Sequence, residues 1–459
     1  MTESSSPINS EESHDALAAF IDTAVRSRLC TRPQLTDALS TLPHESWSAD
    51  TLAQALIAAG QLSRFQCDKL LAGISQGLLL EPYRLLCPVG RGGMGIVYLA
   101  RDDRIRPGKS RFRLLALKLL PPKRALEEPR KLARFQHEME IGKQLPVHPL
   151  LVRYLDTGSV NGVSYIAMEY VPGLSARQLA LEPGGMSAPR AARIFADVAT
   201  ALQVVHAAGF VHRDVKPSNI MVNEQGRGRI LDFGFAMLKG KTVHADPSIL
   251  GGVGYTLGTI DFLAPEQAQN ATHVGHEADI YSLGCSIFMA LAGRVPFPDG
   301  TAQDKMRAHR LKEPESLLLL KPGVPEAFAR LVDWMMKKRP EDRPQSMEQV
   351  ARELERFAEP AMPEPENNNP IQREIETIRL AEARWQSLRG IPTELQTDEL
   401  IPSEPSAIST PRIKKKRRRK QEEPAAEFPW LWVGIGLAVA ALLFGGCLFL
   451  AIIGWLLRG

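Results

Sequence analysis

His212-Arg213-Asp214-Val215-Lys216-Pro217-Ser218-Asn219 places a carboxylate, an ammonium group and a carboxamide within one short polar segment. The segment follows an apolar run of helical spacing and precedes a strand-like run, so its side chains can be held at the mouth of a cleft. Asp214 can accept a proton from a hydroxyl, and Lys216 can neutralise charge on a transferred group. Asn219 can offer its amide oxygen to a hard cation such as Mg²⁺.

Asp232-Phe233-Gly234 adds a second oxygen ligand further along the chain, beside a glycine that permits unusual backbone angles. Either short motif alone is common in proteins of many kinds. Their order, their spacing and the residues around them together predict the metal-binding and base half of a phosphoryl-transfer site.

Upstream of both motifs, glycines at positions 90, 92 and 95 match the pattern G-x-G-x-x-G. A dinucleotide-binding fold would continue with a helix, whereas residues 96–100 are strand-like. A P-loop would need Gly-Lys-Ser/Thr, which is missing. The pattern instead predicts a Gly-rich hairpin whose backbone N–H groups can lie over phosphates.

Lys118 stands alone in the apolar, strand-like run 114–120. A charge buried in this way is costly unless a partner meets it, and phosphates together with a carboxylate would do so. The next segment, residues 132–145, has helical spacing and offers Glu138 and Glu140. Glu138 is the better candidate, because Glu140 points about 200° away around the helix.

With these motifs, residues 83–357 resemble the bacterial eukaryotic-like (Hanks-type) serine/threonine protein kinases. The resemblance implies a bilobal α+β fold, with a small lobe of antiparallel β-sheet plus helix C and a large helical lobe. It also implies ATP as the cofactor, with Mg²⁺ or alternatively Mn²⁺, and transfer of the γ-phosphate to Ser/Thr hydroxyls of protein substrates. Lysine at position 216 is the serine/threonine-type pattern and disfavours tyrosine specificity.

In this family the matching residues have defined roles. Asp214 would deprotonate the substrate hydroxyl, Lys216 would steady the γ-phosphate, and Asn219 and Asp232 would hold the metal ions. Lys118 would hold the α- and β-phosphates and pair with Glu138. The resemblance further implies that the ATP-binding residues are Val89, Gly90, Arg91, Gly92, Gly93, Met94, Gly95, Val97, Ala116, Lys118, Met168, Glu169 and Val171.

The segment Met168-Glu169-Tyr170-Val171-Pro172-Gly173 resembles the hinge between the two kinase lobes. Backbone groups of Glu169 and Val171 would receive adenine, and Met168 would limit the pocket behind it. Residues 148–155 and 164–168 are expected to be the remaining strands of the small lobe.

Residues between Asp232 and Ala264-Pro265-Glu266 are rich in Gly, Ser and Thr. The resemblance makes Arg213 the partner of a phosphorylated residue in this loop, and a phosphate carries enough charge to order such a segment. The candidate autophosphorylation sites are Thr242, Ser248 and Thr256, whereas Thr259 is expected to contact Asp214. Scaffolding roles are implied for Glu266 with Arg343, and for Asp279 with the backbone around His212.

The N-terminal region lacks a kinase-like pattern. Residues 1–13 are polar and expected to be disordered, and apolar residues at helical spacing predict a helical bundle over residues 14–80. Ser48 or Asp50 could cap its third helix, and Gly60 and Gly73 suit helix ends. An interaction module and a ligand sensor are both open roles. Scattered cysteines argue against a zinc site or a disulfide framework.

Residues 358–427 have the composition of a linker, with a solvated or partner-binding helix expected at 371–388 and a basic run at 414–420. Removing that run leaves 49 basic against 52 acidic residues, so a general nucleic-acid binder is disfavoured. The apolar stretch 430–457 predicts one C-terminal transmembrane helix. Its central 21 residues would span roughly 32 Å, against roughly 30 Å of bilayer hydrocarbon.

The basic run predicts that the kinase domain lies on the cytoplasmic side of the inner membrane and the C-terminus on the far side. Small residues at Gly434/Ala438 and Gly436/Ala440 could let two spans approach in a homodimer, although contact with lipid is the other interpretation.

Two other functions fit parts of the pattern. A pseudokinase scaffold at the membrane would lack at least one chemical residue, but Lys118, Asp214, Asn219 and Asp232 are all present. An enzyme that phosphorylates a small molecule would share the base and metal ligands, but the Ala264-Pro265-Glu266 segment favours a polypeptide substrate.

Overall fold

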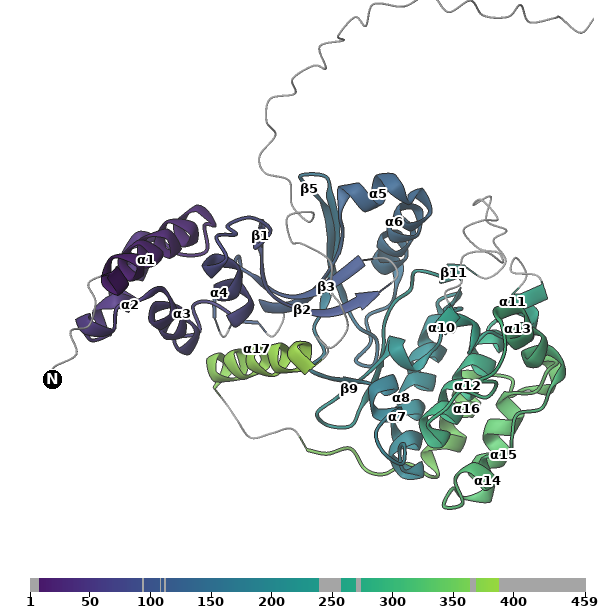
Figure 1. The fold of residues 1–459 in the computed structure, drawn as a ribbon. Helices are drawn as coiled ribbons and strands as arrows, with labels where there is room; N and C mark the ends of the chain where they lie inside the picture. The colour runs from purple at the N-terminus through teal and green to yellow at the C-terminus, as the bar shows by residue number, and fades with distance from the viewer. Residues whose placement is uncertain are drawn as a thin grey trace, which may run out of the picture. The chain divides into compact units, whose positions relative to one another are not determined.

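A computed structural model describes residues 8–92, 95–107, 109–110, 113–238, 257–269, 274–363 and 369–387 of the 459-residue chain (Figure 1). All of these residues belong to the first of two units into which the chain divides, residues 1–405.

Helices precede the first sheet, as the sequence predicts, and together form the N-terminal bundle. They are α1 (Ile8–Arg26), α2 (Arg32–Ser40), α3 (Ala49–Ala58) and α4 (Arg64–Leu71), with a 3-10 turn η1 (His44–Ser46) between α2 and α3. Ser48 caps α3, and Gly60 and Gly73 adopt φ values of 65° and 77° just beyond α3 and α4. The helix α1 begins at Ile8, within the range 1–13 that the sequence predicts to be disordered.

The small lobe contains an antiparallel six-stranded sheet in the order β1-β2-β3-β4-β6-β5. Its strands are β1 (Leu79–Leu80), β2 (Tyr83–Gly92), β3 (Gly95–Asp102), β4 (Leu114–Leu120), β5 (Tyr154–Val160) and β6 (Val163–Glu169). The helices α5 (Pro122–Glu127) and α6 (Pro129–Gln144) follow β4. The strand expected at 148–155 starts only at Tyr154, because residues 148–153 turn into the large lobe, where Leu151 pairs with Ile230.

Both faces of the sheet are covered, which explains why β4 is apolar along its whole length. Leu115, Leu117 and Leu119 point into a core that they share with the N-terminal bundle. Ala116 and Leu120 point to the other face and pack with Phe135 of α6. The alternation of a strand therefore buries both sets of side chains.

The large lobe is mostly helical and is built around two buried helices. One is α8 (Ala188–Ala207), and the other is α12 (Glu277–Ala292), which is buried along nearly its whole length. The other elements of this lobe are β7 (Gly173–Ser175), α7 (Ala176–Ala180), β8 (Phe210–Val211), η3 (Pro217–Asn219), β9 (Ile220–Asn223), β10 (Gly228–Ile230), β11 (Met237–Leu238), α10 (Leu257–Ile260), α11 (Pro265–Gln269), α13 (Ala302–Leu311), α14 (Leu317–Leu320), α15 (Glu326–Met335), η4 (Pro340–Asp342) and α16 (Met347–Glu355).

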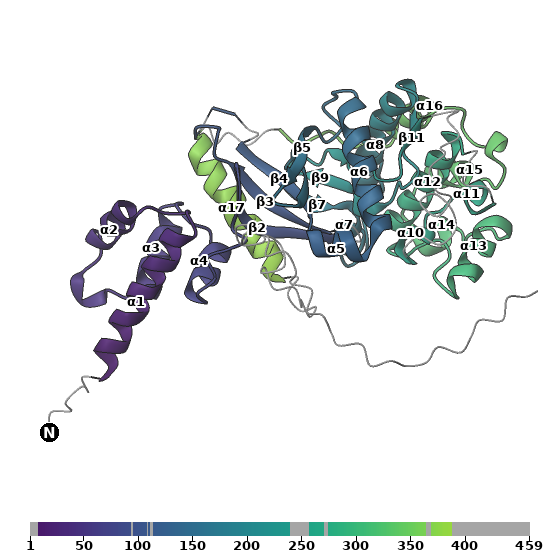
Figure 2. The ribbon, with the colours of Figure 1, turned by 90° about the horizontal axis from the view of Figure 1, so that it is seen from above.

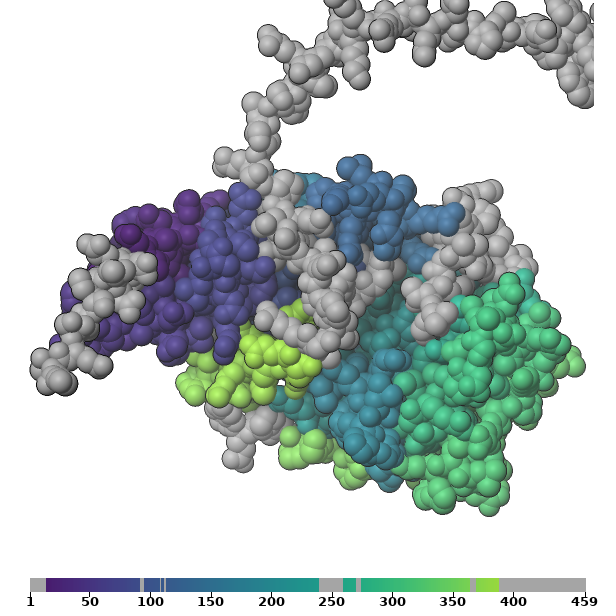
Figure 3. Space-filling model, viewed as in Figure 1, coloured from purple at the N-terminus to yellow at the C-terminus, as the bar shows by residue number. Residues whose placement is uncertain are grey.

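The helix expected at 371–388 is present as α17 (Pro370–Ser387). It lies beside β2 and next to the N-terminal bundle (Figures 1 and 2). Ile378 and Ala381 are buried in the core that joins the bundle to the sheet. The space-filling view shows α17 packed directly against the bundle (Figure 3). The helix is therefore docked rather than solvated on all sides.

Within the described part of the chain, no helix combines the length and the apolar character that crossing a membrane requires. The predicted span 430–457 and the basic run 414–420 lie outside the described residues.

Candidate active site

Residues 212–219 connect β8 to β9 and are here called the catalytic segment. Asp279 of α12 holds the start of this segment by hydrogen bonds. The backbone N–H groups of His212 and Arg213 donate to the Asp279 carboxylate at 2.9 and 2.7 Å. His206 Nε2 lies 2.8 Å from the same carboxylate. Burial alone would raise the pKa of Asp279, but these hydrogen bonds outweigh it and hold that pKa below its usual range. The scaffolding contact that the sequence predicts is present.

Asp214 is the centre of a polar cluster. Lys216 Nζ donates to both of its carboxylate oxygens, at 2.9 and 2.7 Å, and Asn219 Nδ2 donates to one of them at 3.0 Å. Lys216 Nζ also donates to Thr259 Oγ1 at 2.9 Å, so Thr259 is linked to Asp214 through this lysine. Burial raises the pKa of Asp214, although Lys216 acts in the opposite direction.

Lys118 of β4 reaches two carboxylates from different elements. Its Nζ lies 2.6 Å from Glu138 of α6 and 3.5 Å from Asp232, which follows β10. Glu138 is fully buried, whereas Glu140 is exposed and pairs with Lys143. The structure thus places Glu138, and not Glu140, against Lys118.

The pKa values of Lys118, Glu138 and Asp232 are all shifted from their usual values. Burial raises the pKa of Glu138 to about 7, although Lys118 opposes that rise. Burial alone would lower the pKa of Lys118, but the carboxylates of Asp232 and Glu138 outweigh it and raise that pKa. Burial would raise the pKa of Asp232, but the positive charges of Lys118 and Lys216 hold it below its usual range. Lys118 and Asp232 are therefore charged at neutral pH.

The Gly-rich hairpin is formed by the ends of β2 and β3, where Gly92 pairs with Gly95. Gly93 and Met94 lie outside the described residues, as does the side chain of Arg91. A Cβ atom at Gly95 would collide with the carbonyl oxygen of Leu119, so close packing on β4 requires glycine there.

Apolar residues gather beside Lys118 on the same face of the sheet. Ala116 is paired with Met168 across β4 and β6, and both belong to one cluster with Val171. Val97 packs against this cluster, as do Met221 and Leu231, which the sequence analysis missed. Val89 instead contacts the core shared with the N-terminal bundle.

Glu169 has a partner that the sequence did not indicate. Arg229 of β10 donates to its two carboxylate oxygens at 2.8 and 2.7 Å, and also to the Leu151 carbonyl at 2.8 Å. This bidentate pair joins the end of β6 to the large lobe. The only signal in the sequence is a charged residue in an otherwise apolar short strand.

The predicted pair between Glu266 and Arg343 is present, at 2.7 and 2.8 Å. Arg343 is buried and also donates to backbone carbonyls of residues 277, 337 and 338. The candidate phosphorylation sites Thr242, Ser248 and Thr256 lie outside the described residues.

The donor set can be compared with the needs of a divalent cation. No group of three or more His, Cys, Asp or Glu side chains in the described ranges could hold a metal by itself. Mg²⁺ bound with a nucleotide needs only one or two protein oxygens, because phosphates and water complete its octahedron. Asn219 and Asp232 fit that demand, and the Asp232 side chain is 31% exposed and so accessible.

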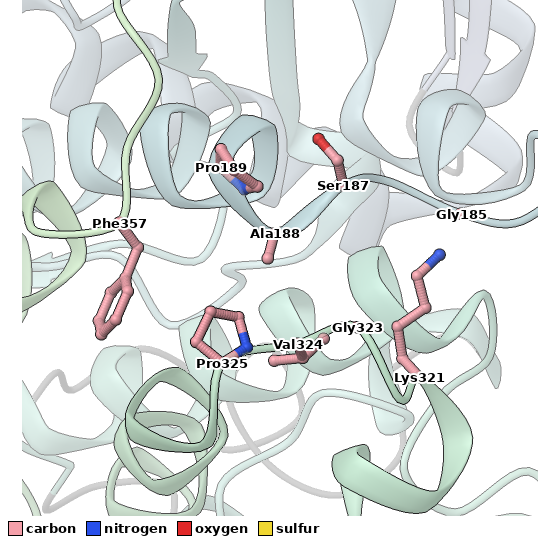
Figure 4. Close-up of a pocket in the computed structure, with 9 residues that line it drawn as sticks. All are labelled: Gly185, Ser187, Ala188, Pro189, Lys321, Gly323, Val324, Pro325 and Phe357. Carbon is pink, nitrogen blue, oxygen red and sulfur yellow. The ribbon is translucent and has the colours of Figure 1, made fainter.

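A separate cavity of about 600 Å³ lies at the N-terminus of α8 and does not include these residues. Ala188, Pro189, Val324, Pro325 and Phe357 give it an apolar wall (Figure 4). It holds no carboxylate and so lacks the chemistry of the cluster at Asp214.

Comparison with known proteins agrees with this geometry. Residues 83–354 match the protein kinase domain family, and the match covers more than half of the chain. The chain therefore belongs to the protein kinase domain family.

Its similar proteins include bacterial enzymes. Serine/threonine-protein kinase pkn3 of Myxococcus xanthus is 34% identical over 280 residues, which is 60% of this chain and 49% of that protein. PknE of Mycobacterium tuberculosis is 35% identical over 268 residues, covering 58% of this chain and 44% of PknE. PknD of the same organism is 34% identical over 268 residues, covering 58% and 38%. The aligned region thus spans half or less of these relatives.

Proposed function

We propose that this protein is an ATP-dependent serine/threonine protein kinase that acts on protein substrates. One observation carries the proposal: Lys118 contacts both Glu138 and Asp232, while Asp214 is held by Lys216 and Asn219. The names of the relatives, all serine/threonine-protein kinases, support the choice of acceptor.

Each residue has a chemical task in this proposal. Asp214 accepts the proton of the substrate hydroxyl, and its raised pKa suits a group that must bind a proton. Lys216 orients Asp214 and offers positive charge to the transferred phosphoryl group. Lys118 holds the nucleotide phosphates and is itself fixed by Glu138.

Asn219 and Asp232 would hold a divalent cation, Mg²⁺ or alternatively Mn²⁺. When bound with ATP, such an ion supplies charge neutralisation at the phosphates. Val97, Ala116, Met168 and Val171 would form an apolar seat for adenine.

Incubation with labelled ATP tests the proposal. Wild-type protein should transfer label to a general protein substrate, and Asp214→Asn should reduce transfer by about 1,000-fold, as expected when a group used only in the transition state is lost. Asp299→Asn is the matched control, because Asp299 is an exposed carboxylate in the same lobe. Nucleotide binding without transfer would favour the pseudokinase, and label found only on small molecules would favour a small-molecule kinase.

We further propose autophosphorylation at one or more of Thr242, Ser248 and Thr256, with Arg213 as the partner of the phosphate. The nearness of Arg213 to Asp214 in sequence supports this role. Mass spectrometry should find phosphate on at least one of these residues in wild-type protein and on none in Asp214→Asn.

We also propose a single transmembrane helix over residues 430–457, with the kinase domain on the cytoplasmic side of the inner membrane. The length, the apolar character and the preceding basic run support it. The full chain should resist extraction from membranes by carbonate, and Leu442→Arg with Leu443→Arg should release it. Cross-linking of the membrane-bound chain would test the homodimer.

A further inference from the structure

The helix α17 caps another helix from far along the chain. Glu382 accepts a hydrogen bond at 3.0 Å from the backbone N–H of Phe65, in the first turn of α4. Ile375 lies against Gly60, just beyond α3. A carboxylate at a helix N-terminus satisfies a backbone donor and interacts favourably with the helix dipole. These two contacts tie α17 to the N-terminal bundle.

A second contact ties α17 to the sheet. Glu374 binds Arg101 of β3 at 2.9 Å and also pairs with Arg113, which precedes β4. The side chains of Glu374 and Arg101 are each only 11% exposed. Since a buried charge is costly without a partner, α17 supplies a group that these two arginines need.

A third contact reaches the connection between the lobes. Arg384 Nη1 donates at 2.7 Å to the carbonyl oxygen of Gly173, where β7 begins. Burial raises the pKa of Tyr170, three residues earlier in the hinge, and the nearby Arg384 guanidinium opposes that rise. Because β7 pairs with β9, this end of α17 is bound to the first strand of the large lobe.

We propose that α17 is a positioning helix that docks in cis on the bundle, the outer face of the sheet and the hinge, and that its docked state sets the affinity for Mg·ATP. The inference rests on the function proposed above, because it deepens the role of the same nucleotide site. Glu374 and Arg384 are the positioning residues.

The side of the sheet that α17 covers explains why docking supports binding. Ile378 and Ala381 share a core with Leu115 and Leu117, which point away from Lys118. The helix therefore steadies the back of β3 and β4, on the side of the sheet opposite Lys118. Only the 14 residues 356–369 separate it from α16 in sequence, so it stays at high effective concentration near its binding surface.

The experiment uses the full chain and compares matched pairs of variants. Glu374→Gln removes the charge that meets Arg101, and Glu376→Gln is its control on the exposed face of α17. Arg384→Ala removes the hinge contacts, Arg384→Lys restores one donor, and Arg379→Ala is the exposed control. The readouts are calorimetric affinity for Mg·ATP and deuterium exchange of the peptide that contains Phe65.

Glu374→Gln and Arg384→Ala should each weaken Mg·ATP binding by about threefold or more, the effect of losing one part-buried ionic contact. Arg384→Lys should recover part of the loss, and both controls should match wild type. Glu374→Gln should also speed exchange at Phe65. The two variants have different partners, so a folding defect in Glu374→Gln leaves Arg384→Ala as the test.

Faster deuterium exchange at Phe65 with unchanged affinity for Mg·ATP would show that α17 only covers apolar surface. Unchanged affinity for Mg·ATP in Arg384→Ala would show that the contact of α17 with the hinge does not influence nucleotide binding. A wild-type chain that binds no Mg·ATP would overturn the inference as well. A wild-type chain that binds Mg·ATP without transferring phosphate would contradict only the kinase activity.

Discussion

Glu138 shows how burial can make one carboxylate sensitive to neutral pH. Its folded-state pKa is raised from 4.5 to about 7, because the side chain is fully buried between α6 and the sheet. The native protein therefore holds a proton there between those two pH values. The protonated carboxyl of Glu138 contributes to the stability of the folded state at low pH. This contribution is lost as the pH rises through about 7. The ion pair with Lys118, by contrast, needs the deprotonated form.

We expect catalytic efficiency with ATP to fall as the pH drops through about 7, because protonation of Glu138 breaks its ion pair with Lys118. Glu138→Gln mimics the protonated form, so it should lower activity by about tenfold or more and flatten this part of the pH profile. Glu140→Gln, on the exposed face of the same helix, should keep the wild-type profile. An acid limb at the same pH in Glu138→Gln would contradict the assignment to Glu138.

Arg229 is expected to stabilise the hinge through its paired bonds to Glu169. Arg229→Lys loses the bidentate geometry and the bond to the Leu151 carbonyl, so the protein should lose about 1–3 kcal/mol of unfolding free energy. Urea denaturation measures this change. Arg177→Lys, at an exposed position, should change the free energy by less than about 0.5 kcal/mol. Equal effects of the two substitutions would show that the Glu169 pair contributes nothing.

Among the secondary-structure elements, α12 holds the catalytic segment in place through Asp279. Asp279→Asn replaces an acceptor of two backbone N–H groups with a side chain that donates from one end, so we expect a loss of about 3 kcal/mol or more. Since the pKa of Asp279 is lowered in the native state, its contribution is present above the unfolded value of 3.8 and is lost in acid.

Thermal unfolding and phosphate transfer should both report the Asp279→Asn change, because the displaced backbone carries Asp214. Glu355→Gln, an exposed carboxylate on α16, is the control. A variant with lowered stability but unchanged transfer would show that α12 does not position the catalytic segment.

Local patterns predicted the elements better than their contacts. Alternation and spacing located β4, α6 and α17 to within a few residues, and one turn of helix was enough to choose Glu138 over Glu140. The partners of Glu169 and Glu382 were not predictable, because Arg229 and Phe65 are far away from them in sequence. Likewise, nothing local reveals that residues 148–153 leave the sheet.

For the chain as a whole, the N-terminal bundle and the small lobe share one core, so a defect in one should spread to the other. Leu56→Ala in α3 should cost about 2–5 kcal/mol, because Leu56 is completely buried. Deuterium exchange should rise in β2 and β3 as well as in α3. Leu126→Ala is the control, since Leu126 is 81% exposed. Faster exchange confined to α1–α4 would show that the bundle folds independently.

Because of this shared core, the segment that matches the family is shorter than the segment that folds together. The family match begins at Tyr83 and stops at Leu354, yet Leu85, Leu99 and Leu117 belong to one core together with residues on both sides of the match. A fragment trimmed to the matched residues would expose an apolar face of the sheet to water and would self-associate.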